Sequence, residues 1–380
     1  MKRLAILSTH PIQYNAPLFR LLAADEAIEL KVFYSKKSEE VRFDKDFGRE
    51  IIWDVPLTQG YVHESFGASA RNGRKQMVRA IEEFNPNALL VYGWNFPGHW
   101  ATMRHFKGRA PVWFRGDSTL LDPLPFWKKV MRKLLLNLVY RSVDRAFYVG
   151  QANKRYFIWA GLQEKQLTYA PHAVDNDYFI RDDEERMKLA VAKRKELGIE
   201  PDATVFLFVG KLEAKKQPEM LGRAFLRLKS TNAHLIYIGS GAMEKDLKSE
   251  FRVSSNIHFI GFQNQQSMPV WYRVGNVLCL PSAGPGETWG LAVNEAMACG
   301  CTAIVSDRVG CGEDLIVRRL GSFVVPFDQL PSWVAILNEL ARQGQEARDI
   351  TEIKRFVNTR FNFRNMITAI KSQLQDVQAT

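Results

Sequence analysis

The chain has 380 residues, 46% of them hydrophobic, which is more than one core usually supports, so two globular domains are expected and a disordered chain is excluded. The formal net charge is +11, and the first 180 residues carry most of it, with 26 Lys and Arg against 18 Asp and Glu. This basic half favours an anionic partner, either nucleic acid, a membrane surface or an acidic substrate, although a merely soluble basic surface has the same composition. No apolar run approaches the roughly 18 residues that a membrane span needs, and the apolar residues 4–7 are too few for a signal peptide.

The first half predicts a parallel sheet. Residues 4–8 and 29–34 read as buried strands, and residues 16–24 between them predict a helix, so the chain begins as a βαβ unit. Short apolar runs at 88–92 and 112–115 predict two further strands of the same domain.

Polar and aromatic side chains follow these strands, at the sheet edge where ligands bind in α/β proteins. They are His10, Gln13, Trp94, His99, Arg115 and Asp117. We interpret them as candidate ligand contacts. Two of them have an alternative that the sequence leaves open, because His10 precedes a proline and could be a loop cap, and His99 could be an ordinary histidine at a helix start.

Residues 126–140, FWKKVMRKLLLNLVY, predict a helix with an apolar stripe, because apolar residues recur three and four positions apart from Trp127 to Leu138. The stripe is flanked by four cations, Lys128, Lys129, Arg132 and Lys133. Tryptophan beside a basic cluster is typical of a helix that lies on an anionic membrane surface. The alternative is a stripe that packs on its own sheet while the lysines are solvated.

The second half repeats the alternation of strand and helix after a proline- and aspartate-bearing hinge at 171–179. Strands are predicted at 205–209, 235–238, 257–260, 276–280 and 301–306. Four cysteines, Cys279, Cys299, Cys301 and Cys311, fall in apolar patterns here, and no histidine completes a metal-ligand spacing around them. They predict buried, reduced side chains and hence a cytoplasmic protein rather than a disulfide framework.

Residues 281–300, PSAGPGETWGLAVNEAMACG, predict a loop that leaves a buried strand and enters a helix. The amides of Trp289, Gly290 and Leu291 stand at the start of that helix and have no acceptors within it, and the helix dipole adds positive potential, which suits a phosphate. Glu287 and Glu295 frame this phosphate seat. A carboxylate repels a phosphate, so these two acids are better suited to sugar hydroxyls.

Several of these segments occur in a fixed order that resembles a known family. In chain order they are Pro171-His-Ala-Val-Asp175, Val205-Phe-Leu-Phe-Val-Gly-Lys-Leu212 with Lys216, His234-Leu-Ile-Tyr-Ile-Gly-Ser-Gly241, Ile257-His-Phe-Ile-Gly-Phe262, and Glu287 and Glu295 followed by Ala-Met-Ala-Cys-Gly300. Together, from about residue 170 to 327, they resemble the retaining nucleotide-sugar glycosyltransferases of family 4. The first half shows much less of this resemblance.

The resemblance implies the GT-B fold, an α/β architecture of two Rossmann-like, doubly wound parallel-sheet domains that face a cleft. Residues 1–172 would form the acceptor-binding domain and residues 173–360 the donor-binding domain. Residues 361–380 would form a C-terminal helix that packs back towards the first domain.

The resemblance also implies retaining transfer of a sugar from a UDP- or GDP-linked donor to a glycan or a lipid-linked saccharide, as in polysaccharide biosynthesis. Glu287 would bind the transferred sugar and Glu295 the ribose hydroxyls. Gly210, Gly261, Phe262 and Thr288 would complete the donor site, and the six residues of the first half would lie near the acceptor or the sugar. Family members often place a histidine after the strand at 88–92, where this chain has Tyr92, Gly93 and Trp94.

Lys211 and Lys216 supply positive charge for such a reaction, because a departing nucleoside diphosphate gains negative charge on its β-phosphate. With that charge met by protein, no metal and no other cofactor is expected. No second carboxylate is placed as a nucleophile, which favours a front-side reaction in which the leaving phosphate accepts the acceptor's proton. Two other functions stay open, a transferase that modifies nucleic acid and a nucleotide-sugar-binding protein without turnover.

Overall fold

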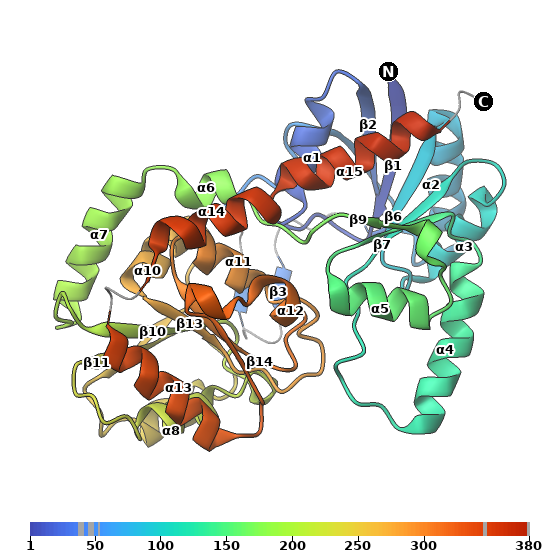
Figure 1. Cartoon of the computed structure of the whole chain (residues 1–380). Helices are drawn as coiled ribbons and strands as arrows, with labels where there is room; N and C mark the ends of the chain where they lie inside the picture. Colours follow the sequence, from blue (N-terminus) through green and yellow to red (C-terminus); the bar gives the residue numbers. More distant parts are fainter. Residues whose placement is uncertain (37–41, 45–48, 52–53, 345–347, 378–380) are drawn as a thin grey trace. The chain divides into compact units, whose positions relative to one another are not determined.

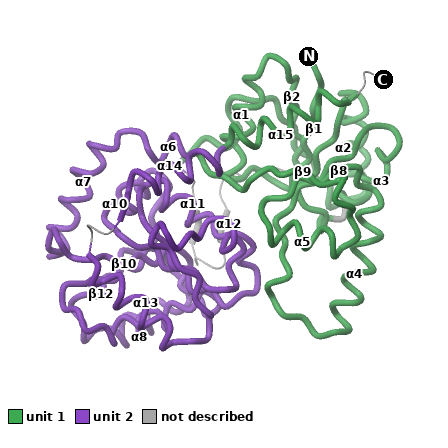
Figure 2. Tube along the Cα trace, viewed as in Figure 1, with its two compact units in different colours: residues 1–40, 55–175, 363–380 green, residues 41–54, 176–362 purple. Residues whose placement is uncertain are grey.

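The computed structural model describes residues 1–36, 42–44, 49–51, 54–344 and 348–377. The chain divides into two compact units (Figure 1, Figure 2). Unit 1 comprises Met1–Glu40, Val55–Asp175 and Phe363–Thr380, and unit 2 comprises Val41–Asp54 and Asn176–Asn362. The described residues 42–44, 49–51 and 54, which are predicted from the sequence to belong to the first domain, group with unit 2.

Unit 1 is built on a seven-stranded sheet with the order β5-β2-β1-β6-β7-β8-β9. All six strand pairs are parallel, so the carboxyl ends of the strands share one edge. The strands are β1 (Lys2–Ser8), β2 (Ile28–Tyr34), β5 (Val62–Ser65), β6 (Ala88–Tyr92), β7 (Val112–Arg115), β8 (Arg145–Tyr148) and β9 (Leu167–Tyr169).

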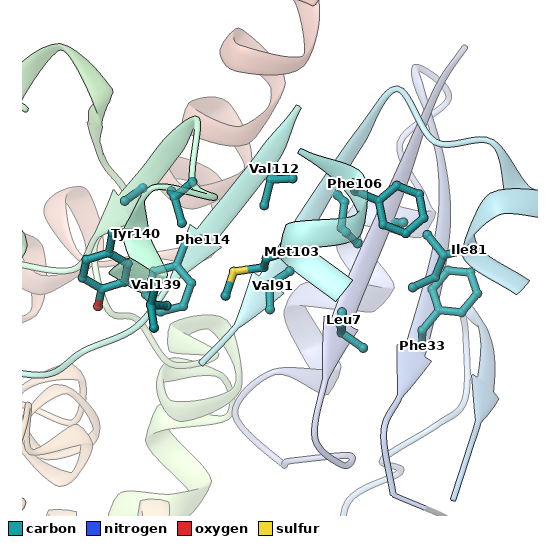
Figure 3. Close-up of a cluster of buried hydrophobic side chains, with 14 of the residues drawn as sticks. Leu7, Phe33, Ile81, Val91, Met103, Phe106, Val112, Phe114, Val139 and Tyr140 are labelled. Carbon is teal, nitrogen blue, oxygen red and sulfur yellow. The ribbon is translucent and has the colours of Figure 1, made fainter. Parts of the chain in front are cut away.

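Helices cover both faces of this sheet because successive side chains of a strand point to opposite faces. Ala5 and Leu7 of β1 join one buried cluster, part of which is shown in Figure 3, whereas Leu4 and Ile6 join another. The first cluster is completed by α2 (Arg71–Phe84), α3 (Pro97–Phe106), α4 (Phe126–Tyr140) and α5 (Gln151–Trp159), and the second by α1 (Ala16–Ala23) and α15 (Phe363–Asp376).

The C-terminal helix α15 belongs to unit 1. Phe363, Met366, Ile370 and Leu374 repeat at helical spacing and are all buried in the second cluster. Lys371 Nζ donates to Asp25 Oδ2 (2.6 Å), and Lys2 Nζ donates to the carbonyl of Val377 (2.8 Å). These contacts fasten the end of the chain beside its beginning, as the position of the two termini in Figure 1 shows.

The helix α4 has the bounds that the sequence predicts, but its apolar stripe does not pack on the sheet. Only its C-terminal turns contribute buried side chains, from Leu136, Val139 and Tyr140. These three lie on another face of the helix, and the stripe itself is exposed along its whole length, with Trp127 at 64%, Leu134 at 62% and Leu138 at 49%. The interpretation of the stripe as a core-facing surface is therefore wrong, because α4 packs on unit 1 through the face that carries Leu136, Val139 and Tyr140 (Figure 1).

Unit 2 is built on a six-stranded sheet with the order β12-β11-β10-β13-β14-β15, again with parallel pairs. The strands are β10 (Thr204–Val209), β11 (Ala233–Ile238), β12 (Ile257–Gly261), β13 (Val277–Leu280), β14 (Thr302–Ser306) and β15 (Phe323–Val325), and β3 (Arg42–Asp44) and β4 (Arg49–Ile51) form a separate antiparallel pair.

The helices of unit 2 surround this sheet. They are α6 (Asn176–Ile180), α7 (Asp183–Glu196), α8 (Pro218–Phe225), α9 (Glu244–Glu250), α10 (Met268–Val274), α11 (Leu291–Ala298), α12 (Gly312–Leu315), α13 (Leu330–Gln343) and α14 (Ile350–Arg360). All four cysteines lie in this unit and are buried, as predicted. Burial raises the pKa of Cys299 to about 12 and of Cys301 to about 11, so these thiols stay protonated at neutral pH.

Candidate active site

The loops that follow β10, β11 and β12 are joined by backbone hydrogen bonds at the carboxyl edge of the unit 2 sheet. The Gly210 amide donates to the Ile238 carbonyl (3.0 Å), and the Gly239 amide donates to the Gly261 carbonyl (2.8 Å). A Cβ at Gly239 would lie 1.9 Å from the Gly210 oxygen, so glycine is required for this close approach. These hydrogen bonds hold the ends of β10, β11 and β12 together, where the predicted donor residues Gly210, Lys211, Gly261 and Phe262 lie.

Backbone hydrogen bonds from residues 310 and 311 hold the loop between β13 and α11 in place. The Gly310 amide donates to the Glu287 carbonyl (3.0 Å), and the Cys311 amide donates to the Trp289 carbonyl (3.0 Å). Gly290, the residue directly before α11, has a φ of 96°, and a Cβ there would lie 2.9 Å from Leu280 Cδ2. No side chain caps α11 within the described chain. The predicted loop and helix entry are thus present, with Trp289 buried and Thr288 and Leu291 half-buried.

Lys216 and Glu287 meet at this loop. Lys216 Nζ forms an ion pair with Glu287 Oε2, and Ser282 Oγ donates to the same oxygen (2.9 Å). The Ala283 amide donates to the Lys215 carbonyl (2.8 Å), which holds the short 3-10 turn Ala214–Lys216 against the loop. The two charged side chains are 19% and 12% exposed, so the pair is largely shielded from water.

A hollow of about 50 Å³ opens beside this ion pair and is lined by Lys215, Lys216, Ser282, Gly284, Pro285, Gly286 and Glu287. A half-buried lysine, a carboxylate and glycine-rich backbone around one hollow suit a ligand that carries both phosphate and hydroxyl groups. Each of these two charged residues is predicted for the site from the sequence, but their mutual neutralisation is not.

Glu295 lies on α11 and is 5% exposed. Tyr272 on α10 donates its hydroxyl to Glu295 Oε2 (2.6 Å), which fixes the direction of the carboxylate. Tyr272 was not among the predicted site residues. Its place in the apolar pattern of residues 268–274 gave it the signature of a core residue, and its ring is indeed buried.

Two predicted residues of unit 1 have structural roles. His99 is completely buried, and because its Nδ1 lies 2.9 Å from the Gly93 carbonyl, Nδ1 carries the proton and Nε2 accepts from Ser35 Oγ (2.6 Å). Burial keeps the pKa of this ring below its ordinary value, so His99 is neutral. The interpretation of His99 as a ligand contact is corrected to that of an ordinary buried histidine.

Arg115 is 4% exposed, and its guanidinium donates to the carbonyls of Ala170 (2.9 Å) and Pro171 (3.2 Å). Arg115 therefore joins the end of β7 to the chain after β9, and the interpretation of its side chain as an acceptor contact is corrected. The carbonyl oxygens replace water around the buried cation, which is costly to bury without such partners.

The other unit 1 candidates follow neighbouring strands. His10 comes after β1, Trp94 after β6 and Asp117 after β7, and these strands are adjacent in the sheet, so the three residues lie along one edge. His10, Gln13 and Trp94 are half-buried. Asp117 Oδ2 lies 4.0 Å from Nε2 of His172, which burial and the nearby Arg115 hold neutral by lowering its pKa to about 4.

His172 was missed as a site residue, although it stands in the segment Pro171-His-Ala-Val-Asp175 that carries part of the family resemblance. It contributes a half-buried neutral imidazole at the same edge of the sheet as Asp117.

Within the described part of the chain, no three or more His, Cys, Asp and Glu side chains are grouped in a way that could hold a metal ion. Among the same residues, no helix is both long enough and apolar enough to cross a membrane.

Comparison with known proteins gives a family match for the second half. Residues 191–355 match the family model described as "Glycosyl transferases group 1". The D-inositol 3-phosphate glycosyltransferase of Mycobacteroides abscessus is 29% identical over 178 residues, which cover 45% of this chain and 38% of that protein. The chain matches less than half the length of this relative and of further curated relatives with the same name.

Solved structures resemble the whole chain. Anabaena HepE, in complex with UDP and glucose, has a TM-score of 0.71 and 15% identity, covering 99% of this chain and 100% of that one. Sucrose-phosphate synthase from Thermosynechococcus elongatus has a TM-score of 0.75 and 15% identity, covering 99% of each chain. With two parallel-sheet α/β units, these likenesses confirm the predicted GT-B fold.

Proposed function

We propose that this chain is a retaining glycosyltransferase of family 4 that moves a sugar from a UDP- or GDP-linked donor to a glycan or a lipid-linked saccharide. The observation that carries the proposal is the shielded pair of Lys216 and Glu287 at the loop before α11, inside the region that matches the group 1 family model. The donor class is supported by HepE, which was solved with UDP and glucose, and by the glycosyltransferase names of the relatives.

In the proposed reaction, the bond between the anomeric carbon and the β-phosphate oxygen breaks while the acceptor oxygen bonds to the same face of that carbon. The leaving phosphate accepts the acceptor's proton. Lys211, Lys216 and the amides that begin α11 stabilise the negative charge that grows on this phosphate. The protein supplies this charge from its own side chains, so we propose that the reaction needs no metal.

The ion pair suggests how the donor is engaged. An arriving diphosphate competes for Lys216, and each bond that Lys216 makes to phosphate releases an oxygen of Glu287 for a sugar hydroxyl. Ser282 remains bonded to Glu287 (2.9 Å) and keeps the carboxylate in place. Glu295, oriented by Tyr272 (2.6 Å), binds the ribose hydroxyls, and Gly261 with Phe262 borders the base.

The deciding experiment is a panel of nucleotide sugars scored by release of nucleoside diphosphate, with Lys216→Ala compared with the control Lys188→Ala. Lys188 on α7 is 73% exposed and pairs with Glu184, whereas Lys216 is 19% exposed and pairs with Glu287. Lys216→Ala should lower turnover by about 10²- to 10³-fold, as loss of one stabilising donor typically does, and Lys188→Ala should leave it within a few-fold.

If the chain binds nucleotide but releases no nucleoside diphosphate from any donor sugar, it is a nucleotide-sugar-binding protein. If sugar is transferred to nucleic acid alone, nucleic acid replaces the proposed saccharide as the acceptor. Equal turnover of the two lysine variants would remove Lys216 from the phosphate.

We also propose that α4 holds the protein on the cytosolic face of an anionic membrane, where lipid-linked acceptors are found. The support is the exposed stripe, which is rimmed by Lys128, Lys129 and Lys133 and contains no Asp or Glu between residues 126 and 140. Lys128 Nζ lies 5.3 Å from the ring centre of Trp127, so a cation and an exposed aromatic ring occupy the same turn. Cations that meet lipid headgroups while apolar side chains enter the membrane are the arrangement of an interfacial helix.

A further inference from the structure

A cavity of about 410 Å³ lies in unit 2, away from the candidate active site. Its walls come from the C-terminal part of α7 and the ends of α10 and α11, and the start of α14 closes it. Asn276, in the cavity wall, comes just before β13, whereas the loop with Glu287 leaves the same strand at its carboxyl end. The cavity is therefore at the opposite edge of the sheet from Lys216 and Glu287.

Two arginines in the wall of the cavity, one buried and one half-buried, make no ion pair to any described residue. Arg194 is 8% exposed, and its guanidinium donates to four neutral oxygens, which are the carbonyls of Val274 (2.9 Å), Pro201 (3.2 Å) and Ala203 (3.3 Å) and Oδ1 of Asn276 (2.9 Å). Arg348 donates to the carbonyl of Asn276 (2.8 Å), and its Nε is buried with no acceptor in the described part of the chain. Burial and the charge of Arg348 lower the pKa of Arg194 to about 10.

A third arginine in the wall is compensated. Arg273 forms an ion pair with Asp183 (2.6 Å), and Asp183 also binds Lys354 (2.8 Å). The carboxylate among the described lining residues is that of Glu200, which is exposed. The buried charge that lacks a counter-ion is thus concentrated at Arg194 and Arg348, where an anion would relieve both the burial and the mutual repulsion.

The remaining wall is apolar and leads to the surface. Met187 and Val191 of α7 and Ile350 of α14 are 41%, 59% and 40% exposed, and Ile199 lies buried further in. The volume is within the range of small-molecule sites, which combine apolar walls with a few polar anchors. A bare inorganic ion would fill the charged end and leave the apolar part empty.

We propose that this cavity binds a small organic anion, a carboxylate or a phosphate monoester with an apolar body, whose head group accepts from Arg348 and is attracted by the charge of Arg194. The site does not depend on the proposed transferase function. Bidentate bonds from a guanidinium to a carboxylate or a phosphate give the head group its specificity.

The test is calorimetric titration of the full chain with hexyl phosphate and with hexanoate. Inorganic phosphate serves as the charged probe without an apolar body, and hexanol as the apolar probe without charge. One of the two amphipathic anions should bind at least about tenfold more tightly than either partial probe, and the tighter one identifies the head group. Binding of neither anion, or equal binding of all four probes, would overturn the proposal.

Four variants locate the site. Arg348→Gln should lower the affinity for the tighter-binding anion by about tenfold or more, the usual effect of losing a charged hydrogen bond. Val191→Glu adds a negative charge at the exposed mouth and should do the same without touching the core, so it decides the question even if Arg348→Gln disturbs folding. Arg342→Gln, which removes an exposed arginine from α13, should change nothing. Lys216→Ala should also bind the anion normally, and loss of binding there would assign the anion to the candidate active site instead.

Discussion

Replacing Lys128, Lys129 and Lys133 of α4 by glutamine should weaken binding to anionic liposomes by about 100-fold. Each cation near an anionic surface contributes up to about 1 kcal/mol, so three contribute up to about 3 kcal/mol, and about 1.4 kcal/mol corresponds to a factor of ten. Arg132 is left unchanged because it donates to the Tyr156 hydroxyl (3.3 Å) and lies 5.4 Å from the centre of that ring. Its guanidinium is part of the packing between α4 and α5.

Flotation with liposomes of graded anionic lipid content measures the effect. A control chain with Lys188, Lys229 and Lys245 of unit 2 changed to glutamine has the same net charge and loses exposed lysines elsewhere, so it should float like the original chain. Raising the salt should reproduce the loss, since attraction to a surface is screened within about 8 to 10 Å at ordinary ionic strength. Thermal stability should barely change, because the three lysines contribute nothing to the buried cores.

A substitution on the apolar side of α4 gives the result that could refute the membrane proposal. Leu134 is 62% exposed, so Leu134→Asn should reduce flotation at every salt concentration while leaving the fold intact. If neither the lysine variant nor Leu134→Asn alters flotation, the membrane proposal fails. If the chain instead self-associates without lipid and Leu134→Asn abolishes this, as sedimentation would show, the stripe is an interface with a second copy.

Three further predictions concern the sites. Glu295→Ala should weaken nucleoside diphosphate binding by about tenfold or more, and Tyr272→Phe by less, because the tyrosine only orients the carboxylate; unchanged titration curves would remove Glu295 from the ribose. The folded chain holds the pKa of His172 near 4, below the roughly 6.5 of an unfolded histidine, so between these pH values the unfolded state binds a proton that the folded state does not. The free energy of unfolding should therefore fall as the pH drops from about 6.5 towards 4. In urea unfolding a His172→Asn variant should lose less stability over that range, and an identical loss would contradict the low pKa of His172. Turnover should survive EDTA, and a loss that Mg²⁺ or Mn²⁺ restores would show that a metal shares the leaving-group charge.

The sheets of both units could be predicted closely because their strands are continuous apolar runs between polar residues. The expected strands at 88–92 and 112–115 have the bounds of β6 and β7. Parallel strands covered on both faces leave this strong signal in the sequence. The helices α5, α13 and α14 were not predicted, although Trp333, Leu337 and Leu340 of α13 are spaced for one buried helix face.

Roles of single polar residues were harder to predict, because position at a strand end does not fix burial. Arg115 stands at the carboxyl end of β7, as a ligand contact would, but its acceptors lie 55 and 56 residues further along the chain. His99 is held by Ser35, 64 residues earlier. Contacts at such separations are products of the tertiary fold and leave no local pattern.

The stripe of α4 also shows that burial is hard to predict from sequence, here for apolar side chains. A period of 3.6 residues identifies which side chains share a face, but it does not say what covers that face. In unit 1 the sheet face is already filled by α2, α3, α5 and the other face of α4, which carries Leu136, Val139 and Tyr140, so the stripe has no sheet left to cover. An exposed apolar patch of this kind marks an interaction surface more often than a solvated one.

The ion pair of Lys216 and Glu287 connects the proposed phosphate contact with the proposed sugar contact. Motif by motif, one residue is assigned to phosphate and the other to sugar, yet they are 71 residues apart and bonded to each other. Loss of turnover in Lys216→Ala therefore has two explanations, the missing cation at the phosphate and a misplaced Glu287. A double-mutant cycle with Glu287→Gln separates them. If Lys216 acts only by positioning Glu287, its removal costs nothing further once Glu287 has lost its charge. If Lys216 binds the departing phosphate, much of its effect must persist in the Glu287→Gln background, because the phosphate still gains its charge there.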